Sequence, residues 1–409
     1  MNVLFIHQNF PGQFGRLAAR LAAAGHRVVG LGEHQSMTKR KAIPGVTRVG
    51  YPTPRGAGDR THPYLHRFEG DVRRAQDVVR VAFKLANDGF VPDVIYGNPG
   101  WGELLFVKDV FPNAAVIALY EFYFRPRGGD YGFDPQFPAD LDSQLRLRIR
   151  NATLQLTLDH VDHIVSPTLW QASRLPEWCA ERVAVIHDGV DTARCHPDTA
   201  AVFAHPRIPK PLTRDNEVLT YVSRNLEPYR GFHRFMQALP TILKARPKAQ
   251  VVIVGGDEVS YGSAPRSGGN WREVMLKEVG SRIDPSRVHF VGKLPYEQFI
   301  VLMQVSSLHL YLTYPFVLSW SVLEAMACGA LVLGSDTPPV SEVIEPGRNG
   351  LLTSFHDPVQ IARDAVAALA TRDDYQVVRE VARARVVERY DFERVCWPAQ
   401  VALIERAAA

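Results

Sequence analysis

Short apolar runs alternate with helical segments along most of this chain, and the alternation starts twice. Val3–Ile6 reads as a buried strand, a glycine-containing loop and a helical stretch closed by Gly25 follow it, and residues 26–31 form the next strand. Strand, loop, helix and strand in this order begin a doubly wound sheet. The pattern stops in a proline-rich polar stretch at about 198–216 and begins again at residues 218–222. Because 409 residues are too many for one ordinary core, the sequence predicts two doubly wound α/β domains.

We place the N-terminal domain at residues 1–205, the C-terminal domain at 206–389 and a C-terminal segment at 390–409. In the N-terminal domain we expect further strands at 94–97, 115–119, 163–166 and 182–186, and helices at 70–87 and 141–158. In the C-terminal domain we expect strands at 218–222, 251–256, 288–291, 308–311 and 331–333, and helices at 231–245 and 358–389.

Composition and charge exclude several classes of protein. The chain is 46% hydrophobic and 22% charged, as folded proteins are, and its net charge of +4 does not call for nucleic acid as a partner. No basic-then-apolar leader is visible, and no apolar run approaches the roughly 20 residues that cross a bilayer, so we expect a cytoplasmic protein. The four cysteines lack metal-ligand spacing, which predicts reduced thiols and no zinc site.

The stretch at residues 315–329 is the most informative for function. Small hydroxylated residues lead there into a helix that carries one carboxylate, Glu324, and ends at Gly329. Free N–H groups at a helix N-terminus can hold an anionic phosphate, and a carboxylate can accept hydrogen bonds from vicinal sugar hydroxyls. An ordinary helix glutamate beside a structural loop is the alternative. The candidate binding groups of the loop are the backbone amides or hydroxyls of Val317, Leu318, Ser319 and Ser321.

Residues 315–345 resemble the donor-site signature of retaining glycosyltransferase family 4. That family has two glutamates eight residues apart; the second falls on Glu324, and the first falls on Phe316, which is not a carboxylate. The resemblance implies the GT-B fold, in which two Rossmann-like domains face a central cleft and the last helix often returns to the N-terminal domain. It also implies that Glu324 binds the ribose of the donor and that Phe316 bears on the choice of sugar.

Arg224 and Arg230 follow the strand at 218–222 and resemble the family's arginine and lysine pair, with Arg230 in the lysine place. A planar guanidinium suits phosphate, and ligands gather at strand carboxyl ends, which favours a diphosphate site over two solvated arginines. The resemblance also places donor nucleotide contacts after the next two strands, at Gly255, Gly256, Val291, Gly292, Lys293 and Leu294.

In the N-terminal domain, the loop before the first helix contains Gly12 and Gly15, where the family usually has two adjacent glycines near the donor. Glu121 stands roughly where the family has a histidine. It fits either a contact with the donor sugar or acceptor nucleophile, or a buried glutamate paired with Arg125 or Arg127. The acceptor-side candidates are Asn98, Trp101, Glu103 and Asp188.

The resemblance thus implies a retaining, metal-independent enzyme that moves a sugar from a nucleotide-diphospho-sugar to a hydroxyl acceptor. A UDP-sugar is favoured over a GDP-sugar, and the acceptor is a glycan, a lipid-linked molecule or a protein in surface glycan or glycoconjugate synthesis. No cofactor is expected, because the nucleotide-sugar is a co-substrate. A nucleotide-sugar epimerase of the same fold and a non-catalytic nucleotide-sugar-binding protein remain as alternatives. The basic clusters at 39–41 and 146–150 fit either solvated helix faces or weak peripheral contact with the inner face of a membrane.

Overall fold

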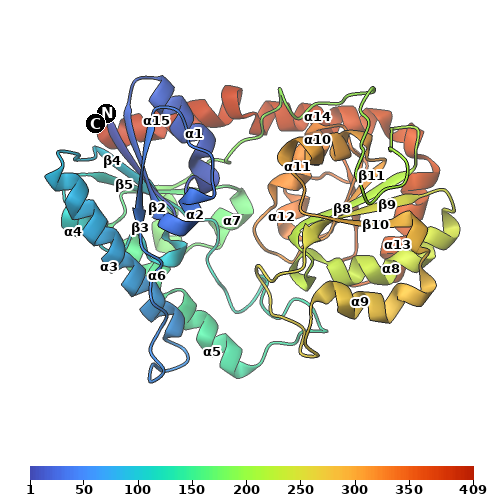
Figure 1. Ribbon diagram of the computed structural model, residues 1–409, viewed down its shortest axis with the longest axis horizontal. Helices are drawn as coiled ribbons and strands as arrows, with labels where there is room; N and C mark the ends of the chain where they lie inside the picture. The colour runs from blue at the N-terminus through green and yellow to red at the C-terminus, as the bar shows by residue number, and fades with distance from the viewer. The chain divides into compact units, whose positions relative to one another are not determined.

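The computed structural model describes all residues from 1 to 409 and contains two parallel sheets (Figure 1). The chain folds into two compact units. Unit 1 comprises Met1–Gly132, Pro138–Gly189 and Glu393–Ala409, and unit 2 comprises Phe133–Phe137 and Val190–Phe392. The prediction of two doubly wound α/β domains is confirmed.

Unit 1 is built on a seven-stranded sheet in which every pair of neighbours is parallel. Its strands, in sheet order, are β3 (Val46–Tyr51), β2 (Arg27–Glu33), β1 (Asn2–Ile6), β4 (Val94–Gly97), β5 (Ala115–Leu119), β6 (His163–Ser166) and β7 (Val183–Val185). The order reverses between β1 and β4, so the loops after these two strands diverge there. Such a point is where open α/β sheets bind ligands.

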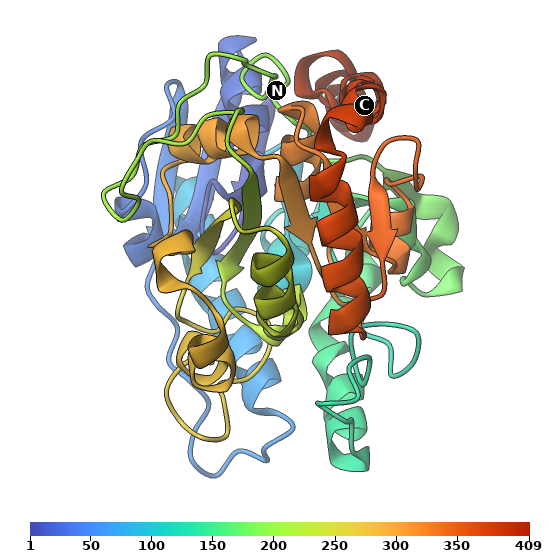
Figure 2. The same ribbon diagram turned by 90° about the vertical axis from the view of Figure 1, so that its right-hand side faces the viewer.

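Helices cover both faces of this sheet, whose central strands are buried on both sides (Figure 1), and helices likewise lie over the sheet of unit 2, which faces the viewer in Figure 2. Val3 and Phe5 pack with α1 and α15, whereas Leu4 and Ile6 pack with α3 and α6. The helices of unit 1 are α1 (Gly15–Ala23), α2 (His34–Thr38), α3 (His66–Asn87), α4 (Val107–Val110), α5 (Leu141–Arg150), α6 (Ala152–His160), α7 (Leu169–Ser173) and α15 (Trp397–Ala408).

Unit 2 repeats the arrangement with six parallel strands, and its order reverses between β8 and β11. The strands, in sheet order, are β10 (Val288–Gly292), β9 (Gln250–Gly256), β8 (Val218–Asn225), β11 (Leu308–Tyr311), β12 (Val332–Ser335) and β13 (Leu351–Thr353). Figure 1 shows α10, α11 and α14 on one face of the sheet and α8, α9 and α13 on the other. The helices are α8 (Phe232–Ala245), α9 (Trp271–Val279), α10 (Tyr296–Val305), α11 (Trp320–Ala327), α12 (Pro338–Ser341), α13 (Pro358–Ala370) and α14 (Gln376–Tyr390).

Several predicted boundaries differ from the structure. The helix expected at 141–158 is interrupted at Asn151, whose side-chain amide bonds both the N–H and the carbonyl of Phe124. The helix expected at 358–389 is interrupted after Ala370, where a short 3₁₀ turn separates α13 from α14. Strands β3 and β13 were not predicted, because each lies at a sheet edge and lacks a continuous buried apolar run.

The boundary between the units lies at Gly189, not at residue 205. Val190 exchanges backbone hydrogen bonds with Tyr390 and Phe392 (2.7 and 2.8 Å), and Phe203 is buried in the core of unit 2. These contacts hold the start of the polar stretch on unit 2. The segment that returns to unit 1 begins at Glu393 rather than at residue 390.

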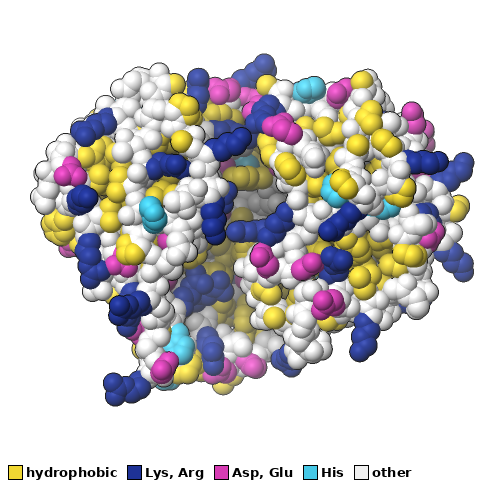
Figure 3. Space-filling model, in the orientation of Figure 1, with side chains coloured by type: hydrophobic (Ala, Val, Ile, Leu, Met, Phe, Trp, Pro, Cys, Tyr) yellow, Lys and Arg dark blue, Asp and Glu magenta, His cyan; other side chains and the backbone are white.

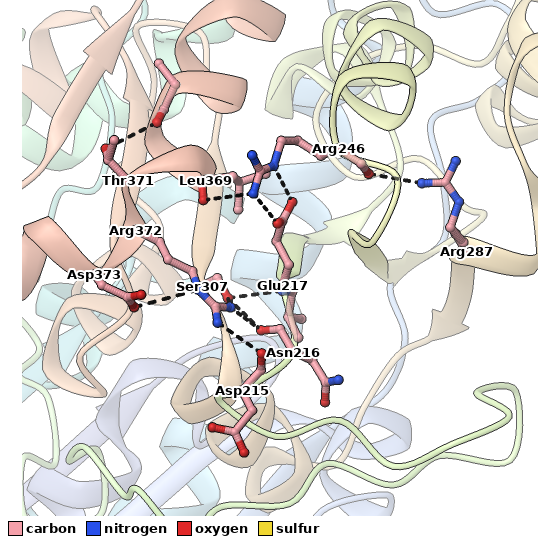
Figure 4. Close-up of polar contacts among 12 residues, drawn as sticks. Asp215, Asn216, Glu217, Arg246, Arg287, Ser307, Leu369, Thr371, Arg372 and Asp373 are labelled. Atoms are coloured by element: carbon pink, nitrogen blue, oxygen red, sulfur yellow. Dashed lines mark hydrogen bonds and ion pairs between the residues drawn. The ribbon is translucent and has the colours of Figure 1, made fainter.

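Arginines fasten the segment before β8 to the ends of neighbouring helices (Figure 4). Arg372 donates to the carbonyl of Asn216 (2.6 Å). Arg246 holds both carboxylate oxygens of Glu217 (2.9 and 2.6 Å) and reaches the carbonyl of Leu369 in the last turn of α13 (3.4 Å). An arginine suits the Leu369 carbonyl because the last carbonyls of a helix lack intrahelical partners and carry partial negative charge.

Candidate functional site

The two predicted phosphate-binding arginines both lie at the point in unit 2 where the strand order reverses. Arg224, near the end of β8, is exposed, and its guanidinium makes no hydrogen bond or ion pair with the protein. Arg230 is buried in the 3₁₀ helix Pro228–Arg230. Its Nη1 donates to Tyr311 Oη, Thr313 Oγ1 and the carbonyl of Val317 (3.2, 2.8 and 2.9 Å). Arg230 therefore joins the loop after β8 to the loop after β11.

The loop after β11 supplies fewer free amides than predicted. The N–H groups of Val317 and Leu318 have no acceptor within the protein, as a phosphate-binding loop requires. The N–H of Ser319 instead donates to Tyr311 Oη (2.9 Å), so the expectation of a free amide at this residue is corrected. Ser319 caps α11 by accepting from the N–H of Ser321 (3.4 Å), and the two hydroxyls lie 3.0 Å apart.

Glu324 lies in α11 and is 7% exposed. Its Oε1 accepts a hydrogen bond from the phenol of Tyr296, the first residue of α10 (2.7 Å). Burial, and then the charge of Glu324, raise the pKa of Tyr296, so the phenol is a donor at neutral pH. A residue of the neighbouring helix α10 therefore orients the Glu324 carboxylate. An exposed glutamate on a helix surface would have no such partner.

Phe316, at the position where the resemblance has a glutamate, is packed among aromatic rings. Its ring centroid lies 5.4 Å from that of Tyr229, edge-on, and 5.0 Å from that of Tyr261. The guanidinium carbon of Arg230 lies 5.8 Å from the centre of the Phe316 ring. The site therefore presents an aromatic wall beside a fixed cation.

Glu227, which the sequence analysis missed, holds the loop that carries Tyr261. Its buried carboxylate accepts from the N–H groups of Ser260, Tyr261 and Gly262 at 3.3, 3.2 and 3.0 Å. The signal available in the sequence was a glutamate directly before Pro228, between the two arginines predicted to bind phosphate. Its role fits a carboxylate buried at a strand end, which needs donors close by.

Gly255 and Gly256 lie close against protein side chains. A Cβ on Gly255 would lie 2.7 Å from a methyl of Leu226, and one on Gly256 would lie 2.4 Å from Asn225 Oδ1 and 2.5 Å from Lys293 Cε. Their predicted role in approaching a ligand therefore has a structural explanation as well.

The other predicted nucleotide contacts follow β10 and differ in exposure. Val291 is buried in the core, Gly292 has a φ of +77°, and Leu294 is half-buried. Lys293 Nζ pairs with the exposed Glu258 (2.7 Å). Val291 therefore exposes no side chain to a ligand, whereas the side chain of Lys293 is exposed.

In unit 1, the loop after β1 meets the loop after β4. Gly12 has a φ of +50°, and a Cβ there would lie 2.7 Å from the His7 ring, whose centroid is 5.2 Å from that of Trp101. Gly15 starts α1 with a φ of −57°, and its Cβ would make only an ordinary 3.5 Å contact with Pro11. Gly12 is thus required for the loop, and Gly15 is not.

Glu121 and Asn98 are brought together at the ends of β5 and β4. Asn98 Nδ2 donates to Glu121 Oε2 (2.8 Å), and Gln171 donates to the Glu121 carbonyl. Arg125 does not pair with Glu121, since its guanidinium donates to the carbonyls of Arg174 and Leu175 (2.9 and 3.0 Å). The structure therefore joins Glu121 and Asn98 in one hydrogen-bonded pair, and their predicted acceptor-side role stays a prediction.

Glu103 is fully buried, which corrects its prediction as an acceptor contact. Tyr51 donates to its Oε1 (2.9 Å), and Arg74 Nε lies 3.9 Å from the same oxygen. Burial raises the pKa of Glu103 to about 7, although Arg74 acts in the opposite direction. Because Arg74 also donates to the Trp101 carbonyl (3.1 Å), the buried group supports the loop at Trp101 from within.

Asp188 is half-buried in the loop after β7. The ring Nδ1 of the preceding His187 accepts from the N–H of Gly189 (3.0 Å), and burial lowers the pKa of His187 to about 4. Arg16, in α1, donates to the Gly189 carbonyl (3.1 Å). The structure therefore places the Asp188 loop next to the helix that follows the Gly12 loop.

Comparison with known proteins gives two family matches. The model described as Glycosyl transferase family 4 group matches residues 24–195, and the model described as Glycosyl transferases group 1 matches residues 206–385. D-inositol 3-phosphate glycosyltransferase from Corynebacterium jeikeium is 26% identical over 245 residues, which are 58% of this chain and 56% of that protein. The chain spans about half the length of the curated relatives it matches.

Solved structures agree with the fold. Sucrose-phosphate synthase from Thermosynechococcus elongatus superposes with a TM-score of 0.74 at 18% identity, and both chains are covered completely. Anabaena HepE in complex with UDP and glucose gives 0.70 at 17% identity, again over all of both chains. At these identities the similarity shows the two-domain Rossmann-like fold alone.

Proposed function

Because this chain belongs to the family 4 group of glycosyltransferases, we propose that it transfers a sugar from a nucleotide-diphospho-sugar to a hydroxyl acceptor. The observation that carries the proposal is the bond from Arg230 to the carbonyl of Val317 (2.9 Å). This bond joins two loops that offer the free guanidinium of Arg224 and the free amides of Val317 and Leu318. These groups would bind the diphosphate of the donor.

Transfer breaks the bond between sugar C1 and the diphosphate oxygen, and the electron pair leaves with the diphosphate. Preorganised donors lower the barrier by stabilising the charge that develops there. Arg224 contributes a planar guanidinium group that is free to bind phosphate, and Arg230 contributes a positive charge held in a fixed position. Glu324, oriented by Tyr296, would accept hydrogen bonds from the ribose hydroxyls.

We propose a retaining course in which the acceptor oxygen attacks the face that the diphosphate leaves. The acceptor proton then passes to a departing phosphate oxygen, and no carboxylate serves as a covalent nucleophile. Phe316 is compatible with this course, because a reaction without a covalent carboxylate nucleophile needs no second carboxylate at that position. The same site favours a transferred sugar with fewer hydroxyls at the edge facing Phe316. A Phe316→Glu variant with unchanged sugar preference would contradict that assignment.

For the nucleotide we favour UDP over GDP, which the UDP and glucose bound to HepE support by analogy. Glu121 and Asn98 of unit 1 are our candidates for contacts with a glycan, lipid-linked or protein acceptor. Surface glycan or glycoconjugate synthesis is the setting that the family suggests. We propose that no metal ion takes part, and EDTA should leave transfer unchanged.

The decisive experiment combines binding and turnover. A thermal-shift panel of UDP, GDP and their sugars identifies the donor, because a bound ligand raises the apparent melting temperature. Arg224→Ala and Glu324→Ala should then each reduce transfer at least about 100-fold, since each removes a charged contact. Arg363→Ala, at an arginine that is 72% exposed in unit 2, is the control. Near-normal transfer by both site variants would refute the assignment.

The absence of a carboxylate at Phe316 also favours a second candidate, a nucleotide-sugar-binding protein without turnover. Donor binding without transfer across a broad acceptor panel would support that alternative. An epimerase of the same fold would instead consume the nucleotide-sugar in the absence of any acceptor.

Weak contact with anionic lipid is part of the proposal because α5 exposes apolar and basic side chains together. Leu141 and Leu145, one helical turn apart, are 69% and 44% exposed, and Arg146 and Arg148 are exposed beside them. On the face drawn in Figure 3, however, Lys and Arg side chains are scattered among uncharged ones rather than gathered in one field. No helix in the structure has the length and apolar character needed to cross a bilayer. Co-sedimentation with phosphatidylglycerol vesicles that Leu141→Gln abolishes would support the contact.

A further inference from the structure

A short segment from between β5 and α5 is built into unit 2. Residues Phe133–Phe137 belong to that unit, and the side chain of Asp134 is fully buried in it. The carboxylate accepts hydrogen bonds from His233 Nε2 and Arg234 Nη2, both at 2.7 Å, and from the phenol of Tyr314 at 3.1 Å. A buried carboxylate with three donors is a specific anchor, because losing one donor there is costly.

Aromatic rings flank the anchor on both sides. The Phe133 ring lies 5.2 Å from that of Tyr314 and 5.2 Å from that of Phe355. The Phe137 ring lies 5.5 Å from that of Trp271 in α9. Two aromatic residues therefore pack the segment against unit 2 on either side of the buried carboxylate in the sequence.

The anchor connects directly to the loop that carries the proposed donor contacts. The Tyr314 ring stacks on Tyr229 with centroids 4.7 Å apart, and the Tyr314 N–H donates to the Tyr229 carbonyl (3.0 Å). Tyr229 in turn meets the edge of Phe316. Burial acts to raise the pKa of Asp134, but hydrogen bonds from His233 and the Gln136 N–H, with the charges of His233 and Arg234, hold it below the usual range. The carboxylate therefore remains an acceptor for Tyr314 at neutral pH.

We propose that Asp134 is a positioning residue for the loop at 313–319, acting through Tyr314. The donor-binding loop is then held in place by a side chain from the stretch of sequence that separates β5 from α5. Its effect on the donor rests on the proposed function, whereas its effect on the order of the loop does not. The alternative is that the segment Phe133–Phe137 stabilises unit 2 without affecting the order of the loop at 313–319.

The test uses Tyr314→Phe, which keeps the ring and removes only the hydroxyl that bonds Asp134, and Asp134→Asn as the stronger change. Phe137→Ala is the control, because it weakens the packing of the segment on Trp271 and His233 (5.5 and 5.6 Å) but leaves the three donors to Asp134 in place. Hydrogen exchange of the Tyr314 amide, measured without ligand in the full chain, should be about tenfold faster in Tyr314→Phe but not in the control. The KM for the nucleotide-sugar and the Kd for the free nucleoside diphosphate should both rise about tenfold, because the loop amides bind the diphosphate that both ligands carry.

Equal exchange rates in Tyr314→Phe and the wild type would overturn the proposal. So would equal losses of melting temperature in all three variants without any change in exchange. A wild type that binds no nucleotide-sugar would refute the proposed function, yet faster exchange in Tyr314→Phe would still support Asp134 as the anchor of the loop.

Discussion

Replacing Glu227 with glutamine should release the loop that carries Tyr261. The carboxylate accepts three backbone N–H groups at 3.0–3.3 Å inside a fully buried site. Hydrogen bonds to charged groups contribute about 1.5–3 kcal/mol each, against about 0.5–1.5 kcal/mol for neutral ones. Converting three of them to neutral bonds therefore costs roughly 3 kcal/mol, and the new amide NH₂ group is left to find an acceptor.

Most of this loss should appear first as local opening, because the three amides belong to one loop. Hydrogen exchange of a peptide covering residues 258–264 measures the opening, and urea unfolding measures the total loss. Glu258→Gln is a matched control in the same loop: that side chain is 75% exposed and bonds only Lys293, so neither measurement should change. The reasoning is wrong if Glu227→Gln costs less than about 0.5 kcal/mol and exchange stays at the wild-type rate.

Three further predictions follow from single residues. Gly12→Ala should destabilise unit 1 by roughly 2 kcal/mol in urea unfolding, because of its positive φ and a ring in contact, whereas Gly15→Ala should be neutral or slightly stabilising. Glu103, with a pKa raised from 4.5 to about 7 on folding, favours folding fully below pH 4.5 and loses that contribution as pH rises to 7. Glu103→Gln should therefore flatten urea stability across that window and stabilise the protein at pH 8 by roughly 3 kcal/mol; a loss at pH 8 would contradict this. Tyr296→Phe should weaken UDP binding about tenfold in calorimetry but leave the affinity for a dideoxyribose analogue unchanged, since it acts through Glu324; equal losses would indicate a structural role.

The fold was predictable because its central strands are continuous apolar runs that a doubly wound sheet buries on both faces. Strand 94–97 and strand 115–119 are of this kind, and the structure has them at the predicted residues. The edge strands β3 and β13 escaped prediction because each is only partly buried and has a mixed pattern. Long helices were merged where a single residue, such as Asn151, binds outside its own helix.

The position of Arg224 and Arg230 at and after the end of β8 was predictable from the sequence, whereas their role in binding a diphosphate stays a prediction. The sequence analysis missed the residues that hold or orient other residues through hydrogen bonds. Glu227, Tyr296 and Asp134 each have their partner at least 28 residues away in the sequence, and no local pattern reveals such a pair. Glu103 was misassigned because a glutamate after a strand looks the same in sequence whether it faces solvent or the core.

The arginine contacts drawn in Figure 4 bear on how the protein responds to ionic strength. Of its 47 basic residues only nine are lysines, and a chain so rich in arginine suggests a salt-sensitive network of ion pairs. Yet Arg372 donates to the carbonyls of Asp215 and Asn216, which are uncharged, and the ion pair of Arg246 with Glu217 is partly buried, where salt screens less. Mobile ions screen charges over about 8–10 Å at physiological salt but leave hydrogen bonds to neutral acceptors largely intact. Raising the salt concentration should therefore weaken the binding of an anionic ligand at Arg224 well before it loosens the segment before β8.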